Sequence, residues 1–130
     1  MDFGTGWILA LPLILSKHCQ NVVASDIKKL AKQELNLEDE KILNFSLDRI
    51  KYVKPCDISK TNFKERSFDL ITSKSVLEHI PRKVMPAEAM ECFRILYDMS
   101  VCSFHVSHRD HWSHTDNKLE PMNYLKFSEL

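Results

Sequence analysis

Short apolar runs alternate with amphipathic stretches along most of the chain, and this alternation predicts βαβ units that build a parallel sheet. Buried strands are expected at residues 21–25 and 68–73, because both runs are short and rich in apolar residues. Residues 101–106 predict a further strand, and residues 51–54, which alternate with polar positions before Pro55, predict an edge strand. The sequence therefore predicts an α/β fold with a mostly parallel sheet.

Helical patterns fill the segments between these strands. They cover residues 8–15, 27–37, 38–50, 75–80 and 86–96. The first of them lacks a polar face, which predicts a helix that is buried on both sides. The last is the best amphipathic pattern. Its apolar face is expected to consist of Ala89, Met90, Phe93 and Leu96, or alternatively of Leu96 with Cys92. No repeat or linker interrupts the pattern, so we expect one domain over residues 1–130.

Size and charge narrow the class of protein. A chain of 130 residues can bury a core, and 44% apolar with 28% charged residues is typical of a soluble globular protein. Lys plus Arg and Asp plus Glu both number 18, so the chain has no formal net charge that would attract a phosphate backbone or an anionic membrane. We therefore expect a small-molecule substrate, with neither nucleic acid nor a membrane as partner.

The spacing of the cysteines and the first apolar run indicate in which cellular compartment the protein is expected. The four cysteines are scattered without a C-x-x-C pair, which favours free thiols in a reducing cytosol. The apolar run at residues 7–15 is shorter than the roughly 20 residues that span a bilayer. It also lacks the basic region of a signal peptide. We therefore expect a cytoplasmic protein.

The only two glycines, Gly4 and Gly6, fall in one predicted turn. Glycine permits positive φ angles and a close approach of the backbone to a ligand. Ligands of open α/β sheets bind outside the carboxyl ends of the strands, and three acids, Asp2, Asp26 and Asp57, lie at expected strand ends. Asp26 follows Gly6 by about twenty residues, the spacing at which an acid can accept from ribose hydroxyls. Any one of these acids alone is more often a cap or loop residue, and it is the spacing from the glycine turn to Asp26 that indicates a ligand site at these strand ends.

Several segments, in order, resemble the class I S-adenosylmethionine-dependent methyltransferases. Asp-Phe-Gly-Thr-Gly at residues 2–6 is similar to their first motif, and residues 22–26 are similar to the second. Further matches lie at residues 56–58 with 67–71, 68–81 and 91–96. The run at 68–81 is the most specific, since few other α/β proteins carry it. The resemblance implies a Rossmann-like fold and transfer of a methyl group from S-adenosylmethionine to a small-molecule acceptor.

The resemblance also implies which residues bind the methionine end of that cofactor. Gly4 and Gly6 would border the methionine portion, and Asp2 would orient its amino group. Ser73 and Lys74 would line the floor near the sulfonium through their backbone.

At the nucleoside end, the resemblance implies that Asp26 accepts from both ribose hydroxyls, with Ile27 beside it. Asp57 would accept from the adenine amino group, and the N–H of Ile58 would meet the ring. A dinucleotide such as NAD is disfavoured, because its fingerprint needs a third glycine where Leu9 stands.

Histidines recur at every third position near the end of the chain, at His105, His108, His111 and His114. On a helix this spacing would gather metal ligands, but the segment is polar and follows a strand, so we expect a lid loop and no metal site. Imidazole can exchange a proton near neutral pH, which makes His111, and behind it His79, the candidates for a general base.

The sequence departs from the family pattern in several places. Little chain precedes Asp2 for the first strand, and the last two of the usual seven strands are expected beyond the end of the chain. A third glycine is missing near Ile8, and residues 97–100 replace the usual Pro-Gly-Gly turn. We therefore expect a sheet that is incomplete at the first strand and at the C-terminal strands. The alternative function is an inactive, methyltransferase-like remnant that serves as a binding or interaction module.

Overall fold

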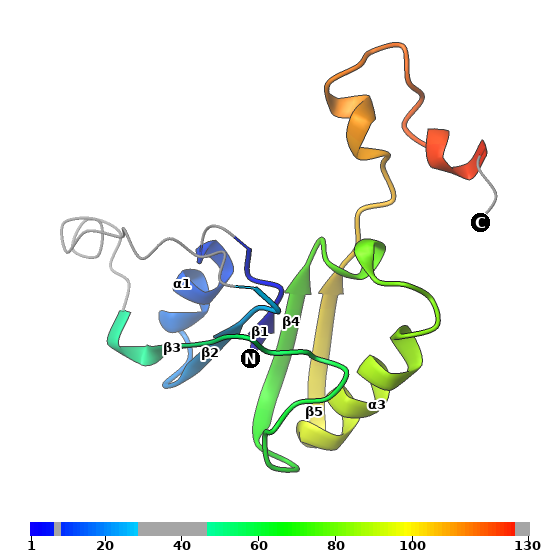
Figure 1. Cartoon of the computed structure of the whole chain (residues 1–130). Helices are drawn as coiled ribbons and strands as arrows, with labels where there is room; N and C mark the ends of the chain where they lie inside the picture. The colour runs from blue at the N-terminus through cyan, green and yellow to red at the C-terminus, as the bar shows by residue number, and fades with distance from the viewer. Residues whose placement is uncertain (7–8, 29–46, 127–130) are drawn as a thin grey trace.

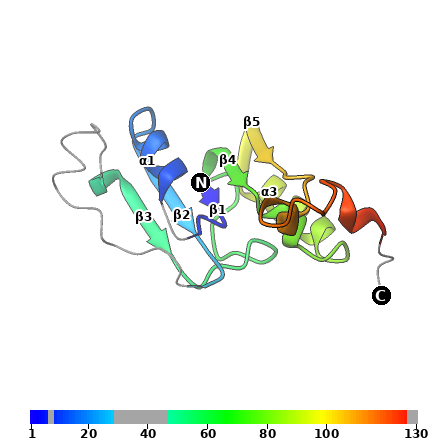
Figure 2. The same cartoon turned by 90° about the horizontal axis from the view of Figure 1, so that it is seen from above.

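A computed structural model of the chain describes residues 1–6, 9–28 and 47–126. In this part of the chain five strands form one sheet in which every pair is parallel, with the order β3-β2-β1-β4-β5 (Figures 1 and 2). The strands are β1 (Asp2–Phe3), β2 (Val22–Ser25), β3 (Ile50–Val53), β4 (Phe68–Lys74) and β5 (Leu96–His105). The predicted α/β fold with a parallel sheet is confirmed.

The strand order reverses beside β1, the central strand. β1 has only two residues, yet it pairs with β2 through Asp2 and Ala24 and with β4 through Asp2 and Thr72. The chain first builds β2 and β3 on one side of β1, and then β4 and β5 on the other. Such a reversal opens a crevice at the carboxyl ends of the central strands, where open α/β sheets bind their ligands.

Helix α1 (Ala10–Ser16) packs on β2 and β3. Leu9 and Leu13 form a small core with Ala24, but Ile14 is 52% exposed. The prediction of a helix buried on both sides is therefore wrong, because the sheet covers only one of its faces. Pro12 lies in the first turn, where its missing N–H costs no helical hydrogen bond.

Helix α3 (Met85–Ile95) and α1 cover opposite faces of the sheet (Figure 2). α3 begins one residue before the predicted position, and its buried residues are Glu88, Cys92 and Ile95. Met90 and Phe93 are 73% and 83% exposed, and Ala89 is exposed too, so the first predicted face is wrong, whereas the alternative of Leu96 with Cys92 agrees with the buried side. Of the members of the first face only Leu96, just after the helix, packs against the core.

The main core lies between α3 and the central strands. Its buried members are Met1, Phe3, Ile58, Ile71, Cys92 and Ile95. Cys92 follows Glu88 by four residues, and Ile95 follows Cys92 by three. This spacing puts the three side chains on one face of the helix. That face meets the sheet although it carries a carboxyl group and a thiol.

Other predicted elements are confirmed with shifted ends. The edge strand predicted at 51–54 is β3, and β5 begins at Leu96, five residues before the predicted start. Residues 77–79 form a short 3₁₀ helix within the predicted 75–80. Most of each of the helices predicted at 27–37 and 38–50 lies outside the described residues. The described ends differ from a helix at 27–28, which form a bend, and at residue 50, which begins β3, while Leu47–Arg49 forms a short 3₁₀ helix.

Beyond β5 the chain continues past the carboxyl end of the sheet (Figure 1). The segment predicted as a loop contains two short 3₁₀ helices, His111–His114 and Asn123–Lys126. Among the described residues, no helix has both the length and the apolar character needed to cross a membrane.

Candidate functional site

Gly4 and Gly6 follow β1 directly, and both have the positive φ angles that the turn requires, +66° and +72°. A Cβ atom on Gly4 would lie 2.3 Å from Cγ2 of Val76, so the turn packs tightly against the segment that follows β4. Among the described residues, which leave out residues 7–8, none would lie within 4 Å of a Cβ atom on Gly6. Gly4 thus serves close packing, whereas the backbone at Gly6 borders open space that a ligand can enter.

Asp26 lies immediately beyond β2 and is 5% exposed. Its Oδ2 accepts a hydrogen bond from the N–H of Gly6 over 2.9 Å, and its Oδ1 accepts from the N–H of Lys28 over 3.2 Å. The backbone of Asp26 also fixes the segment that follows β3: its N–H donates to Val53, and its carbonyl accepts from Cys56 over 2.8 Å. Asp26 therefore connects the carboxyl ends of three neighbouring strands.

Asp2 lies within β1 and is 3% exposed. The hydroxyl of Thr72 donates to its Oδ1 over 2.8 Å, and the hydroxyl of Thr5 donates to its Oδ2 over 3.3 Å. Burial raises the pKa of Asp2 above its ordinary value, and these hydrogen bonds offset only part of that effect. A role toward a ligand's amino group stays a prediction for this residue.

A cavity of about 130 Å³ lies at the carboxyl ends of β1 and β2. Of the predicted cofactor residues, Gly4, Asp26, Ile27, Asp57 and Ile58 line it. Phe3, Cys56, Val76, Ile80 and Glu88 complete the wall. The structure thus brings together the predicted nucleoside-binding residues, which come from the ends of two strands and the segment after a third.

The predicted nucleoside-binding residues that line this cavity differ in how they are held and in how exposed they are. Asp57 Oδ1 accepts from the N–H and the hydroxyl of Ser59, over 2.9 and 2.7 Å, which fixes its carboxylate. Ile58 is 7% exposed and belongs to the main core, whereas Ile27 is 62% exposed. One wall is therefore apolar and rigid, and the other is open to solvent.

Four predicted residues do not line this cavity: Asp2, Gly6, Ser73 and Lys74. Ser73 is buried, and its hydroxyl donates to the carbonyl of Phe3 over 3.1 Å. Lys74 is exposed at the end of β4. All four lie at or near the carboxyl ends of β1 and β4, and the cavity lies at the same edge of the sheet.

Sequence reasoning missed Glu88, on the first turn of α3. It is 6% exposed, it lines the cavity, and its Oε2 has no hydrogen-bond partner among the described residues. Burial raises the pKa of Glu88, and the nearby charge of Asp57 raises it further. Its helical spacing to Cys92 and Ile95 was the signal that this carboxyl group faces inward.

The structure brings the two candidate histidines together. The ring centroids of His79 and His111 are 4.9 Å apart, although the residues are distant in the sequence. Glu78 joins them, and one ligand atom from each residue lies within 4.8 Å of the others. His105, His108 and His114 are not part of this cluster among the described residues. Neither His79 nor His111 lines the cavity, so a general-base role stays a prediction.

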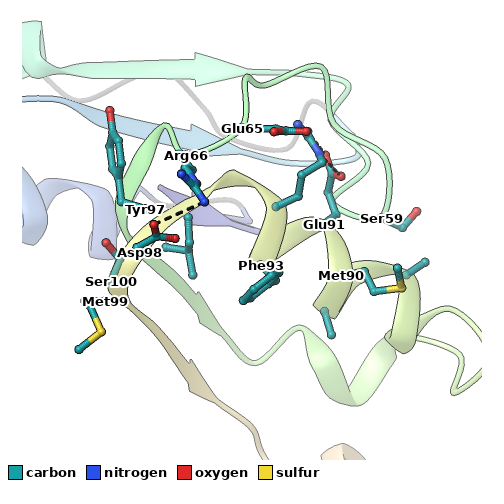
Figure 3. A pocket seen from close by; sticks show the side chains of 14 residues that line it. Ser59, Glu65, Arg66, Met90, Glu91, Phe93, Tyr97, Asp98, Met99 and Ser100 are labelled. Atoms are coloured by element: carbon teal, nitrogen blue, oxygen red, sulfur yellow. Dashed lines mark hydrogen bonds and ion pairs between the residues drawn. The ribbon is translucent and has the colours of Figure 1, made fainter.

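A larger hollow of about 1130 Å³ lies along α3 and the start of β5 (Figure 3). None of the predicted site residues lines it. Its charged groups pair with one another: Arg66 with Asp98 over 3.4 Å, and Glu91 with Arg94 over 2.6 Å. Within the part of the chain that the structure describes, no buried polar side chain of this hollow lacks a partner, so we place the candidate site at the smaller cavity.

Comparison with known protein families shows to which family this chain belongs. A family described as a methyltransferase domain matches residues 1–104. The chain belongs to this family. The matched residues contain the whole parallel sheet up to Phe104, together with every residue of the cavity. The resemblance to class I S-adenosylmethionine-dependent methyltransferases is confirmed.

Solved structures share the fold of this methyltransferase domain. Phosphoethanolamine N-methyltransferase 1 of Haemonchus contortus, in complex with phosphoethanolamine and S-adenosylhomocysteine, is 18% identical with a TM-score of 0.61 over 82% of this chain. A Methanococcus maripaludis protein described as an S-adenosyl-L-methionine-dependent methyltransferase is 25% identical, with a TM-score of 0.62 over 79%. The YcgJ protein of Bacillus subtilis is 19% identical, with a TM-score of 0.61 over 78%.

The chain spans less than half of each of these proteins, namely 21%, 45% and 40% of their lengths in the order given. The comparison with curated proteins gives no match.

Proposed function

We propose that this methyltransferase domain binds S-adenosylmethionine at the carboxyl edge of β1, β2 and β4 and transfers its methyl group to a small-molecule acceptor. The observation that carries the proposal is the single cavity lined by Gly4, Asp26 and Asp57, three residues expected to bind the cofactor. The phosphoethanolamine held by the Haemonchus relative supports an acceptor of small size.

The donor and acceptor groups of the site fit the cofactor. Asp26 keeps its carboxylate at the cavity wall, where it can accept from ribose hydroxyls in charge-assisted hydrogen bonds. The carboxyl groups of Asp57 and Glu88 offer acceptors at the other end, toward an adenine amino group. The apolar side chains of Phe3 and Ile58 can pack against the faces of a base.

A cavity of about 130 Å³ is too small for the whole cofactor, so the methionine end would extend past Gly6. There the backbone borders open space, with the ends of β1 and β4 below. Asp2, Ser73 and Lys74 come from these two strands, which supports their assignment to the methionine end.

The chemistry needs little from the protein beyond orientation. When bound, S-adenosylmethionine supplies an activated methyl group on a sulfonium, which an acceptor atom attacks in line. The chain's own residues hold the nucleoside, fix the direction of the methyl group and leave one side open to the acceptor. The absence of net charge and the scattered free thiols support a small-molecule acceptor and a cytoplasmic site of action.

Isothermal titration of the chain with S-adenosylmethionine and with S-adenosylhomocysteine tests the proposal. We expect one binding site for each ligand and no binding of NAD under the same conditions. Formation of S-adenosylhomocysteine in the presence of pooled amines, phenols and carboxylic acids then tests transfer. A folded chain that binds neither ligand would contradict the proposal and favour an inactive binding module. Binding of NAD instead would indicate a dinucleotide enzyme.

A further inference from the structure

The cluster of Glu78, His79 and His111 lies between the segment after β4 and the segment after β5. Each residue offers one metal-ligand atom, and all of these atoms lie within 4.8 Å of one another. The cluster is separate from the cavity, but Val76 and Ile80, on either side of Glu78 and His79, line that cavity.

Glu78 shows that the cluster is more than a chance approach of surface side chains. Its Oε1 accepts a hydrogen bond from the N–H of Ser107 over 3.2 Å, which fixes the carboxylate between the two segments. Its Oε2 is buried and has no hydrogen-bond partner among the described residues. A buried carboxylate oxygen without a partner is costly unless a donor or a cation satisfies it.

The position of His111 is fixed by its neighbours. The side chain of Asp110 accepts from the N–H of Trp112 over 2.9 Å and thereby caps the short helix that begins at His111. The N–H of Asp110 donates to the carbonyl of Pro121 over 2.7 Å, and Asn123 donates to Oδ2 of Asp110 over 3.3 Å. His111 is therefore held on a locally bonded segment that presents it to His79.

We propose that Glu78, His79 and His111 bind one divalent transition metal ion of the zinc class. Two imidazole nitrogens and one carboxylate oxygen are the ligands of zinc sites that keep a fourth position open. Calcium and magnesium prefer all-oxygen sites, which this cluster does not provide. The sequence predicted no metal at the four histidines, because their segment is polar and follows a strand. Only His111 of these four takes part in the cluster, and the other two ligands come from the segment after β4.

The spacing of the ligand atoms suits one bound ion. Ligand atoms at about 2.0–2.2 Å from a zinc ion lie at most about 4.4 Å from one another. The ligand atoms of the cluster lie within 4.8 Å of one another, close to this limit, and both histidines are exposed, with their rings in edge-to-face contact. A bound ion would tie the segment after β5 to the segment that closes the cavity. It would also occupy one nitrogen of each imidazole, so under this proposal the two histidines would act as metal ligands instead of general bases.

Titration of the metal-free chain with Co²⁺, followed by its visible absorption, tests the site, with Zn²⁺ as competitor. We expect one Co²⁺ per chain, displaced by one equivalent of Zn²⁺. His79→Gln and His111→Gln should each weaken Co²⁺ binding by more than about 100-fold, because changing even a residue that only supports a ligand costs about 10–100-fold. Glu78→Gln keeps an acceptor for Ser107 and should weaken binding as well.

Matched controls separate this site from other metal-binding groups. His108→Gln and His114→Gln change neighbouring histidines outside the cluster and should leave Co²⁺ affinity unchanged. Cys102→Ser, which removes an exposed thiol, should also leave it unchanged. No Co²⁺ uptake by a chain whose circular dichroism shows it to be folded would overturn the proposal, as would uptake that neither His79→Gln nor His111→Gln alters. S-adenosylhomocysteine binding in the same variants shows independently whether the cofactor proposal stands.

Discussion

The N–H of Gly6 donates a hydrogen bond to Oδ2 of Asp26 over 2.9 Å, and this bond joins the turn after β1 to the end of β2. The acid expected to bind a ribose is thus also the anchor of the glycine turn expected to bind the methionine end. One side chain couples both halves of the proposed cofactor site, so the position of the turn and the affinity for the nucleoside depend on the same carboxylate.

Asp26→Asn separates these two roles. The amide oxygen of asparagine can still accept from Gly6, so the fold should persist, but the charge that strengthens hydrogen bonds to ribose hydroxyls is lost. We expect the affinity for S-adenosylhomocysteine to fall about 10–100-fold, the equivalent of a charged hydrogen bond. Isothermal titration measures this, with the exposed Asp69→Asn as a matched control. Equal affinities in the two variants would exclude Asp26 from the site.

The two glycines of the turn should respond differently to alanine. At Gly4 a Cβ atom meets Val76 at 2.3 Å and φ is +66°, so overlap and strain add. We expect Gly4→Ala to lower the free energy of unfolding by about 2–5 kcal/mol. Gly6→Ala carries only the strain of its positive φ, about 1–2 kcal/mol. Urea denaturation compares the two variants. Combining Gly4→Ala with Val76→Ala should recover part of the loss, and no recovery would rule out the overlap as its cause.

Asp2 should make the fold less stable as the pH rises. Burial raises its pKa in the folded state, so above the ordinary carboxyl value the unfolded chain gives up this proton more readily than the folded chain. The contribution of Asp2 to stability therefore falls as the pH rises from about 4 toward its raised pKa. Asp2→Asn removes the titration, so its urea midpoint should fall less between pH 4 and pH 7 than that of the wild type. An identical fall in both proteins would refute this assignment.

Glu88 has a raised pKa for a related reason, with the charge of Asp57 added to burial. Glu88→Gln keeps the shape of the side chain and removes the charge from the cavity wall. We expect the variant to be more stable than the wild type at pH 7, with the difference shrinking as the pH falls through the raised pKa of Glu88 and gone below about 4. Thermal unfolding at several pH values measures this difference. Asp57→Asn should give a smaller gain in stability, since it removes only the charge of Asp57 and leaves Glu88 buried. A larger gain than that of Glu88→Gln would mean that the charge of Asp57 outweighs burial as the cause of the raised Glu88 pKa.

The sequence was sufficient to predict the part of the site that depends on strand ends. Parallel strands bring their carboxyl ends to one edge, so acids that follow β2 and β3 must approach a turn that follows β1. Gly4, Asp26 and Asp57 line one cavity for that reason. Four of the strands were predictable from short apolar or alternating runs, but β1, which has only two residues, was not. β5 also starts earlier than its apolar run, and Met99 near its start has a positive φ of 64°.

What the sequence did not reveal depends on contacts between distant segments. The pairing of His79 with His111 follows from where the chain travels after β5, which no local pattern encodes. The inward face of α3 was misjudged because hydrophobicity favoured Met90 and Phe93, whereas packing on the sheet selected Cys92 and Ile95 and turned Glu88 toward the cavity. Burial of a carboxyl group at a ligand site runs against the usual pattern, as expected where function outweighs local preference.

The orientation of α3 gives a direct test of the fold through two residues close together on one helix. Ile95 is fully buried in the main core, so Ile95→Ala should lower the free energy of unfolding by about 2–5 kcal/mol. Phe93 is 83% exposed, and Phe93→Ala should change that free energy by no more than about 0.5 kcal/mol, because little apolar contact is lost. Urea denaturation of both variants gives the comparison. The opposite ranking would mean that the helix turns its Met90 and Phe93 side to the sheet, which would also remove Glu88 from the cavity wall.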